Sequence, residues 1–230
     1  MESFITTEIV REILENPPRS LTAIKAELLF LDGTYIFHSK GGYKYLSTAT
    51  LRNAFSNIPI DSGWLEPGVM RCGSKPSGDW AVKFIAPQTH KLDCNELGTV
   101  TVPLPAMVFA GSLTTYWVWA LKGQEFASDA QLFHAPLPNV HTRNGEICWG
   151  SNQPPSCNPQ SINAAWELFI SSPFNSHLAN DKSKRCPEDI RQQLGKLAVK
   201  KAKKYPVSDL KPLPQNWTAD SLVEAIAQND

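Results

Sequence analysis

The part of the chain best suited to covalent chemistry is the stretch APLPNVHTRNGEICWGS, residues 135–151. It begins as a polar loop punctuated by prolines and ends in a short apolar run around Cys148, with a glycine on either side. Because the loop before it is long and polar, we expect this thiol near the surface, where the glycines let a bulky group approach closely. An accessible thiol is a candidate nucleophile whose reactivity depends on its folded neighbours.

A side-chain amide, that of Asn139, stands nine residues before the cysteine. An amide N–H can stabilise the oxyanion that forms when a thiolate or an amine attacks a carbonyl group. The intervening loop is long enough to fold back and bring Asn139 to Cys148. Two other interpretations stay open from these residues alone. Cys148 could be an unreactive bystander, and Asn139 could be a turn residue that binds its own backbone.

The whole chain has the composition of an ordinary globular protein. Its 230 residues suffice for one large domain, or one domain with extensions, and 42% are hydrophobic and 19% charged. The formal net charge of zero gives no indication of a nucleic acid or an anionic membrane as partner. No run of about 18 apolar residues predicts a membrane span, and the acidic N-terminal segment does not resemble a signal peptide. Five cysteines, an odd number without close pairs, argue against disulfides and favour the cytoplasm.

One segment departs from this neutral balance. Between Lys182 and Lys204 the chain carries nine basic residues against Glu188 and Asp189. Such an excess suits a basic arm that docks onto a partner, and it equally suits a solvated helix face. The sequence leaves both interpretations open.

Local patterns divide the N-terminal quarter of the chain into a helix, a hairpin and a second helix. Apolar residues at helical spacing predict the first helix, and Asn16-Pro17-Pro18 ends it. The Asp32-Gly33 pair between two apolar runs then predicts a β-hairpin. Residues 46–58 have the pattern of the second helix.

Apolar runs separated by polar gaps predict four strands that form an antiparallel meander. These strands span Val69–Gly73, Trp80–Ala86, Thr99–Ala110 and Thr115–Leu121. The following residues, 127–160, lack a regular pattern, and an irregular stretch of this length is often functional. We expect three further helices, which begin near Pro159, at Pro187 and near Thr218.

The stretch LPNVHTRNGEICWG resembles the active-site stretch of ubiquitin-conjugating enzymes. In that family a His-Pro-Asn triplet precedes a short loop, a glycine, an aliphatic residue and the catalytic cysteine. The residues that fall on this pattern are Pro138, Asn139, Val140, Gly145, Ile147 and Cys148. The order of a helix, four strands, the loop, the cysteine and a crossing helix is also similar, over roughly residues 47–178.

The resemblance is closer to a bacterial branch, the prokaryotic ubiquitin-conjugating-like family D, which includes PRTRC system protein B. The segments that carry it are TVPLPAMVFAG, VWALKG, LFHAPLPNVHTRNGEICWG and FISSPFNSH. It implies an α+β, UBC-like fold, in which a helix and a four-stranded antiparallel meander precede the active-site loop and a crossing helix. We accordingly expect a UBC-like catalytic domain at residues 46–180. An N-terminal helix and hairpin extension at 1–45 and a basic C-terminal helical arm at 181–230 would flank it.

The resemblance also implies an activity. Cys148 would accept a bacterial ubiquitin-like protein as a thioester from a ThiF-type activating enzyme and pass it to an amine acceptor, with Asn139 as the oxyanion donor. Members of the branch are usually encoded near such an activating enzyme, a ubiquitin-like protein and a JAB-type peptidase, which makes these three the expected partners. Neither a cofactor nor a metal ion is expected.

The chain departs from the family pattern at one position, because Leu137 stands where the triplet has its histidine. The bacterial branch has a histidine downstream of the cysteine instead, and His177 in SPFNSH is similar in position, while His141 within the loop is the rival. Either histidine could orient the loop, take a proton from the incoming amine, or be an ordinary surface residue. Asp181 and Asp129 are the carboxylates we consider for lowering the amine pKa.

Three other functions compete with this one. A catalytically inactive UBC-like module could bind a ubiquitin-like protein without carrying it, although the kept cysteine and asparagine argue against that. A cysteine hydrolase could pair Cys148 with His177, although its chain order fits less well. A zinc site would have to draw on scattered cysteines and histidines, because the sequence holds no C-x-x-C or H-x-x-x-H pair.

Overall fold

The computed structural model describes residues 26–31, 34–39, 42–47, 64–75, 77–213 and 216–228. The chain divides into two compact units, Met1–Ser62 and Gly63–Asp230. The helix predicted near the N-terminus lies outside the described residues. Nearly all of the helix predicted at 46–58 also lies outside the described residues. Of that range the structure describes Leu46, which is the last residue of a strand, and Ser47.

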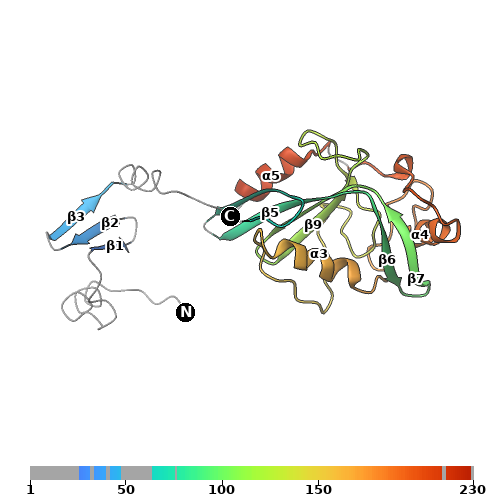
Figure 1. Ribbon diagram of the computed structural model, residues 1–230, viewed down its shortest axis with the longest axis horizontal. Helices are drawn as coiled ribbons and strands as arrows, with labels where there is room; N and C mark the ends of the chain where they lie inside the picture. The colour runs from blue at the N-terminus through green and yellow to red at the C-terminus, as the bar shows by residue number, and fades with distance from the viewer. Residues whose placement is uncertain are drawn as a thin grey trace. The chain divides into compact units, whose positions relative to one another are not determined.

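The described part of the first unit is a three-stranded antiparallel sheet with the order β1-β2-β3, drawn in blue in Figure 1. Its strands are β1 Ala26–Leu31, β2 Thr34–Ser39 and β3 Gly42–Leu46. Leu29 lies opposite Ile36 in the β1–β2 register, so the predicted hairpin is confirmed. The sequence pattern does not predict β3, because its side chains are largely exposed and leave no apolar face to mark the strand.

The second unit is built on a five-stranded antiparallel sheet with the order β10-β9-β8-β5-β4. Its strands are β4 Val69–Lys75, β5 Gly78–Ile85, β8 Met107–Ser112, β9 Thr115–Ala120 and β10 Phe133–His134. β4, β5, β8 and β9 pair antiparallel in this order, as predicted for a meander, but two further strands lie between β5 and β8 in the chain. β10 is only two residues long and adds an edge strand inside the stretch that we expected to be irregular.

The third predicted strand, Thr99–Ala110, is wrong, because the chain forms two strands there. β7, Gly98–Leu104, ends before Pro105, and β8 begins at Met107. Pro105 has no N–H to donate to a ladder and lies in the break, whereas Pro103 is tolerated within β7, which pairs only with β6. β7 pairs with β6, Gln88–Cys94, as a separate hairpin inserted between β5 and β8. We expected a loop at β6, because its sequence QTHKLDC has few apolar residues.

Two helices cover opposite faces of the five-stranded sheet, as Figure 1 shows for α3 and α5. Successive residues of a strand point to opposite faces. Phe109 of β8 accordingly packs in the cluster that contains the α3 side chains, and its neighbour Val108 packs in the cluster that contains those of α5. α3 spans Ile162–Ser171 and α5 spans Ala219–Gln228, so both helices lie where the sequence predicts them. All six residues of β8 are buried as a result.

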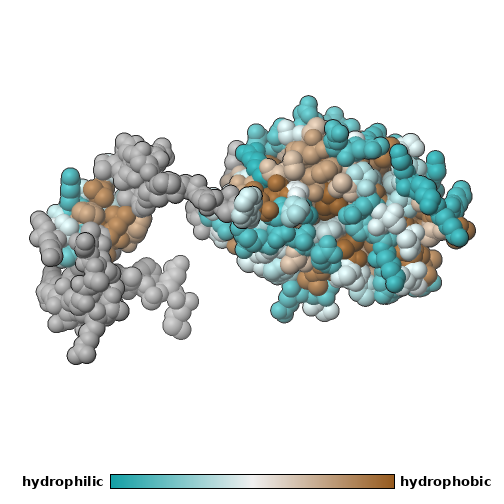
Figure 2. Space-filling view, in the orientation of Figure 1, coloured by the Kyte–Doolittle hydropathy of each residue, from teal (hydrophilic) through white to brown (hydrophobic). Residues whose placement is uncertain are grey.

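Part of the basic segment is built into this unit. Its helix α4, Ile190–Val199, packs against β7 and begins later than the expected Pro187, because Asp189 is the N-cap and accepts a hydrogen bond from the Arg191 amide at 2.8 Å. The Arg191 side chain is buried and pairs with both Asp189 and Glu96. Hydrophilic residues gather at this end of the unit, on the right of Figure 2.

The chain after α4 returns to the body of the unit. A short 3-10 helix, η2 Val207–Asp209, is followed by a bridge between Leu210 and Ser183. None of the helices in the described part of the chain has the length and apolar character needed to span a membrane. The proposed domain boundaries at residues 45 and 180 stay predictions.

Candidate active site

Cys148 follows a tight turn that closes on itself. Val140 and Ile147 form an antiparallel bridge at the base of the turn. Above the bridge, the His141 amide donates a hydrogen bond to the Glu146 carbonyl at 2.8 Å. The thiol therefore lies one residue beyond a small, internally bonded hairpin rather than at the end of a loose loop.

Gly145 lets this turn approach the main sheet. Its φ is +76°, in the region that favours glycine, and a Cβ added there would overlap the indole of Trp119 on β9. The Gly145 carbonyl accepts from the Val118 amide at 2.9 Å, and the Ile147 amide donates to the Tyr116 carbonyl at 2.8 Å. The bulky group that the glycine admits is thus a tryptophan of the scaffold.

The loop folds back and brings Asn139 to Cys148. The Cys148 amide donates to the Asn139 carbonyl at 2.8 Å, and the Asn139 amide donates to the His177 carbonyl at 3.0 Å. Asn139 has a φ of +58°, a conformation that asparagine adopts more readily than most residues. Main-chain hydrogen bonds therefore connect all three residues.

A cavity of about 500 Å³ opens beside this loop. The residues that line it are Asn139, Cys148, Trp149, Gly150, Ser151, Asn152, Phe169, Ser172, Pro173, Asn175 and His177. Three of the four residues predicted from the sequence to act in catalysis thus share one cavity. The fourth, His141, is exposed within the turn and is not among the lining residues. Of the two candidate histidines, the structure brings His177 to the cysteine.

The side-chain amide of Asn139 is held only weakly. Its Nδ2 donates to the Pro173 carbonyl at 3.4 Å, which is long for a hydrogen bond. Its buried Oδ1 has no partner among the described residues, and an unpaired buried acceptor costs about 1–3 kcal/mol. An amide in this state keeps N–H groups available for another acceptor at the cavity, such as a developing oxyanion.

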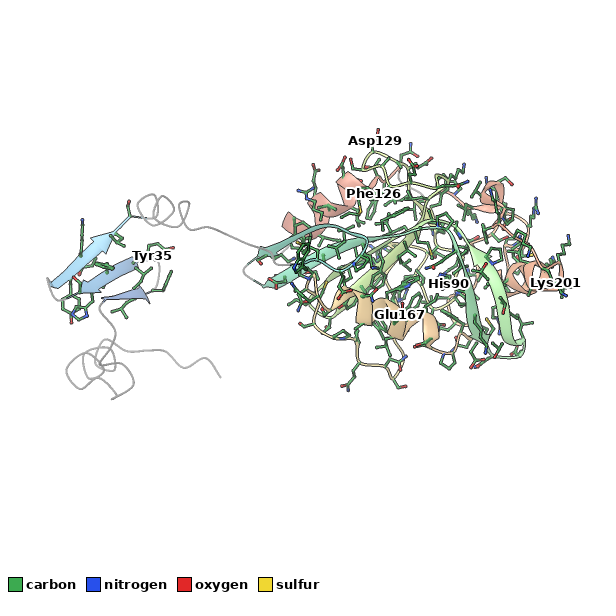
Figure 3. All side chains as sticks on the ribbon, viewed as in Figure 1. Tyr35, His90, Phe126, Asp129, Glu167 and Lys201 are labelled. Carbon is green, nitrogen blue, oxygen red and sulfur yellow. The ribbon has the colours of Figure 1, made fainter. Side chains whose placement is uncertain are left out.

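The cavity carries no aspartate, glutamate, lysine or arginine among its described lining residues. Asp181 instead forms an ion pair with Lys211, whose ammonium lowers the pKa of that carboxyl. Asp129 is exposed in a loop at the upper edge of the unit in Figure 3. Neither of the two carboxylates that we considered therefore lines the cavity, whereas His177 does.

Sequence reasoning missed four polar residues of the cavity wall, which are Ser151, Asn152, Ser172 and Asn175. Asn152 donates from Nδ2 to the Ser172 hydroxyl at 2.9 Å, and this contact joins the loop after the cysteine to the end of α3. Asn175 accepts a hydrogen bond at Oδ1 from the His177 amide at 2.7 Å. The Asn-x-His spacing was the available signal for the second contact, since asparagine commonly bonds the amide two residues on.

The other cysteines lie in different surroundings. Cys94 and Cys157 are buried, and burial raises the pKa of each thiol to about 11. Cys186 is also buried, and Cys72 is partly buried on β4. Cys148 is the cysteine that combines partial exposure with a cavity. Among the described residues, no three His, Cys, Asp or Glu side chains gather closely enough to hold a metal ion.

Comparison with known proteins identifies the family. The sequence profile of prokaryotic E2 family D matches residues 42–213, which is most of the chain. No curated protein and no solved structure matches the chain significantly. The matched range contains the turn, the cavity with all its lining residues, and α4. The resemblance found in the sequence is thereby confirmed at the level of the family, and the chain belongs to prokaryotic E2 family D.

Proposed function

We propose that this protein is a ubiquitin-conjugating-like enzyme that carries a bacterial ubiquitin-like protein as a thioester on Cys148. The observation that supports it most directly is the cavity in which Cys148, Asn139 and His177 meet. Membership of prokaryotic E2 family D supports an E2-like role independently of that geometry.

In the first step, Cys148 takes the ubiquitin-like protein from a ThiF-type activating enzyme. The Cys148 thiol loses its proton, its thiolate attacks the thioester carbonyl, and a new C–S bond forms to Cys148. The C–S bond to the activating enzyme breaks, and the sulfur of that enzyme leaves as thiolate and can take up a proton in place of the one that Cys148 lost. One thioester replaces another, so this step needs no ATP. The amide hydrogens of Asn139 stabilise the oxyanion that forms in between.

In the second step, an amine attacks the thioester on Cys148. The C–N bond forms, the C–S bond breaks, and the cysteine leaves as thiolate. The attacking nitrogen must lose a proton, and His177 at the cavity is the group we assign to accept it. A JAB-type peptidase in the same pathway, as in PRTRC-type systems, would reverse the conjugation. We place the reaction in the cytoplasm.

An intermediate trap tests the proposal. The protein is incubated with ATP, the ThiF-type enzyme and the ubiquitin-like protein encoded nearby, and then analysed by non-reducing gel and intact mass. We expect an adduct that thiol removes and that Cys148→Ala abolishes, while Cys148→Ser gives a thiol-resistant ester. Cys72→Ala is the matched control, because Cys72 is partly buried but not at the cavity. Absence of an adduct alongside a charged activating enzyme would contradict a carrier role and favour a binding module.

A further inference from the structure

Lys182 is a lysine that the reaction above does not use, and it is among the largest fully buried side chains of the described residues. It is 1% exposed, and burial lowers the pKa of its amino group. Among the described residues, no carboxylate forms an ion pair with it. Burying an amino group without a countercharge is costly unless its hydrogens find acceptors. The acceptors of the Lys182 amino group therefore indicate the role of this side chain.

Both acceptors belong to the loop that carries Asn139. Lys182 Nζ donates to the Leu137 carbonyl at 2.7 Å and also to the Val140 carbonyl. These carbonyls stand on either side of the Pro138-Asn139 pair. An amine has two hydrogens and an ammonium three, so Lys182 can serve both carbonyls in either protonation state.

The loop has no obvious substitute for these two bonds. The Leu137 side chain is apolar and fully buried, so it cannot donate to a neighbouring carbonyl, and Pro138 has no N–H. Inward carbonyls without a donor would each cost about 1–3 kcal/mol. Lys182 thus makes it possible for the loop to turn two carbonyls inward while Asn139 faces the cavity.

Lys182 completes a set of contacts made by one short segment. Residues 173–182 supply the Pro173 carbonyl to the Asn139 side chain, the His177 carbonyl to the Asn139 amide, and the Lys182 amino group to the loop on both sides. Lys182 itself is not among the lining residues of the cavity. We infer that Lys182 is a positioning residue, which acts on the reaction by holding the loop that presents Asn139 and Cys148. The effect of Lys182 on transfer rests on the proposed function, whereas its effect on the position of the loop does not.

Two substitutions test the inference in the full-length protein. Lys182→Met keeps a long unbranched side chain, one atom shorter, and removes both hydrogen bonds, whereas Lys182→Gln has the same length as methionine but keeps a donor. Leu222→Ala is the control, because Leu222 is buried on α5 in the other core cluster and its loss costs stability without removing a hydrogen bond of the loop. Urea denaturation gives the stability of each variant.

The first readout is hydrogen exchange of the peptides that cover residues 137–148, which needs no partner protein. We expect the Asn139 and Cys148 amides to exchange about tenfold faster in Lys182→Met than in Leu222→Ala at matched stability, with Lys182→Gln in between. Loop exchange equal to that of Leu222→Ala, in either substituted variant that folds, overturns the inference.

The second readout separates loading of the thioester from its discharge. We expect discharge to an amine to fall about 100-fold in Lys182→Met, since small misplacement of reacting groups is costly. Alkylation of Cys148 by iodoacetamide should stay close to wild type, because the thiol keeps its cavity. Unchanged discharge in a variant whose loop exchanges faster would contradict the link to catalysis. If the wild type forms no thioester, the proposed function fails, while hydrogen exchange still decides the role of Lys182.

Discussion

The main sheet and the loop that carries Cys148 are held in place by different forces. Every residue of β8 is buried between two helix-covered faces, so its position depends on many apolar contacts at once. The loop also buries Leu137, Val140 and Ile147 in the core, but the main-chain groups around Asn139 depend on a few hydrogen bonds from distant residues, chiefly those of His177 and Lys182. A residue held by apolar packing keeps most of its contacts when one is removed, whereas a buried polar group that loses its hydrogen-bond partner has no replacement. Single substitutions should therefore have their largest effects where the loop meets the sheet.

The strongest expected effect is at Gly145, where the turn contacts the sheet. Gly145→Ala combines a left-handed φ with overlap of the Trp119 indole, and we expect a loss of stability of about 4 kcal/mol. Gly150→Ala is the matched control, because Gly150 also has a positive φ, +59°, but nothing lies near the added Cβ. It should cost about 1 kcal/mol in urea denaturation. Equal losses in the two variants would mean that contact with the sheet contributes little.

Asn139 should show the next largest effect, on rate rather than on stability. Asn139→Ala removes the oxyanion donor and should slow amine transfer by about 100-fold to 1,000-fold. Asn152→Ala removes a neighbouring amide that bonds Ser172 in the cavity wall, and we expect it to have a much smaller effect. Single-turnover discharge of the loaded enzyme measures both. Similar losses would indicate that the amides only shape the cavity.

His134 should make the loop region sensitive to acid. It is buried on β10, and burial together with Lys182 and Lys211, only partly opposed by Asp181, lowers its pKa from 6.5 to about 4. Between these pH values the unfolded chain binds a proton that the folded protein does not, so stability falls as the pH drops through this window. The loss by pH 4 should be about 3 kcal/mol.

Urea denaturation across this pH range checks the expectation for His134. His134→Gln removes the titrating group and should flatten the pH dependence between 6.5 and 4. A dependence of unchanged steepness in that variant would assign the acid sensitivity to other groups.

The two histidines near the cysteine offer a paired test. His177→Ala should slow amine transfer about 100-fold by removing the proton acceptor, while His141→Ala should change it little. Single-turnover discharge of the loaded enzyme supplies the check, because transfer should slow markedly only in His177→Ala. The reverse result would transfer the role to His141, which lies outside the lining of the cavity.

The smallest effect concerns the scaffold. Asp189→Ala removes the N-cap of α4 and one of the two carboxylates paired with Arg191, and it should cost about 2 kcal/mol in stability without changing transfer. Asp189→Asn keeps a capping oxygen and should lose less. A transfer defect in the alanine variant would mean that α4, through its contact with β7, is coupled to the site.

The strands of the sheet could be predicted because buried strands contain runs of apolar residues that are visible in the sequence. Apolar runs mark β4, β5, β8 and β9, and the same rule explains two failures. β6 has few apolar residues, so its sequence favours a loop. The long apolar run around Pro105 reads as one strand, although the chain forms two strands there. The α4 start was misjudged for a similar reason, since Asp189 looks like a first-turn acid until its side chain is seen to cap the helix.

The site could be predicted in part. The thiol, the amide and His177 follow from the resemblance to the family, and the fold-back of the loop follows from its length. Lys182 could not be found in this way, because in the sequence it begins a run of basic residues, a pattern typical of a charged surface. Its burial results from contacts more than 40 residues away along the chain. Long-range polar contacts of this kind leave no periodic pattern.

The hydrogen bond between the Asn139 amide and the His177 carbonyl has an evolutionary consequence. His177 holds Asn139 through its main-chain carbonyl, which every amino acid possesses, and the same residue lines the cavity. A mutation at this position can therefore alter the chemistry of the cavity without loosening the loop. Selection can act on catalysis and on architecture separately at this residue, whereas at Lys182, where the side chain does the holding, it cannot.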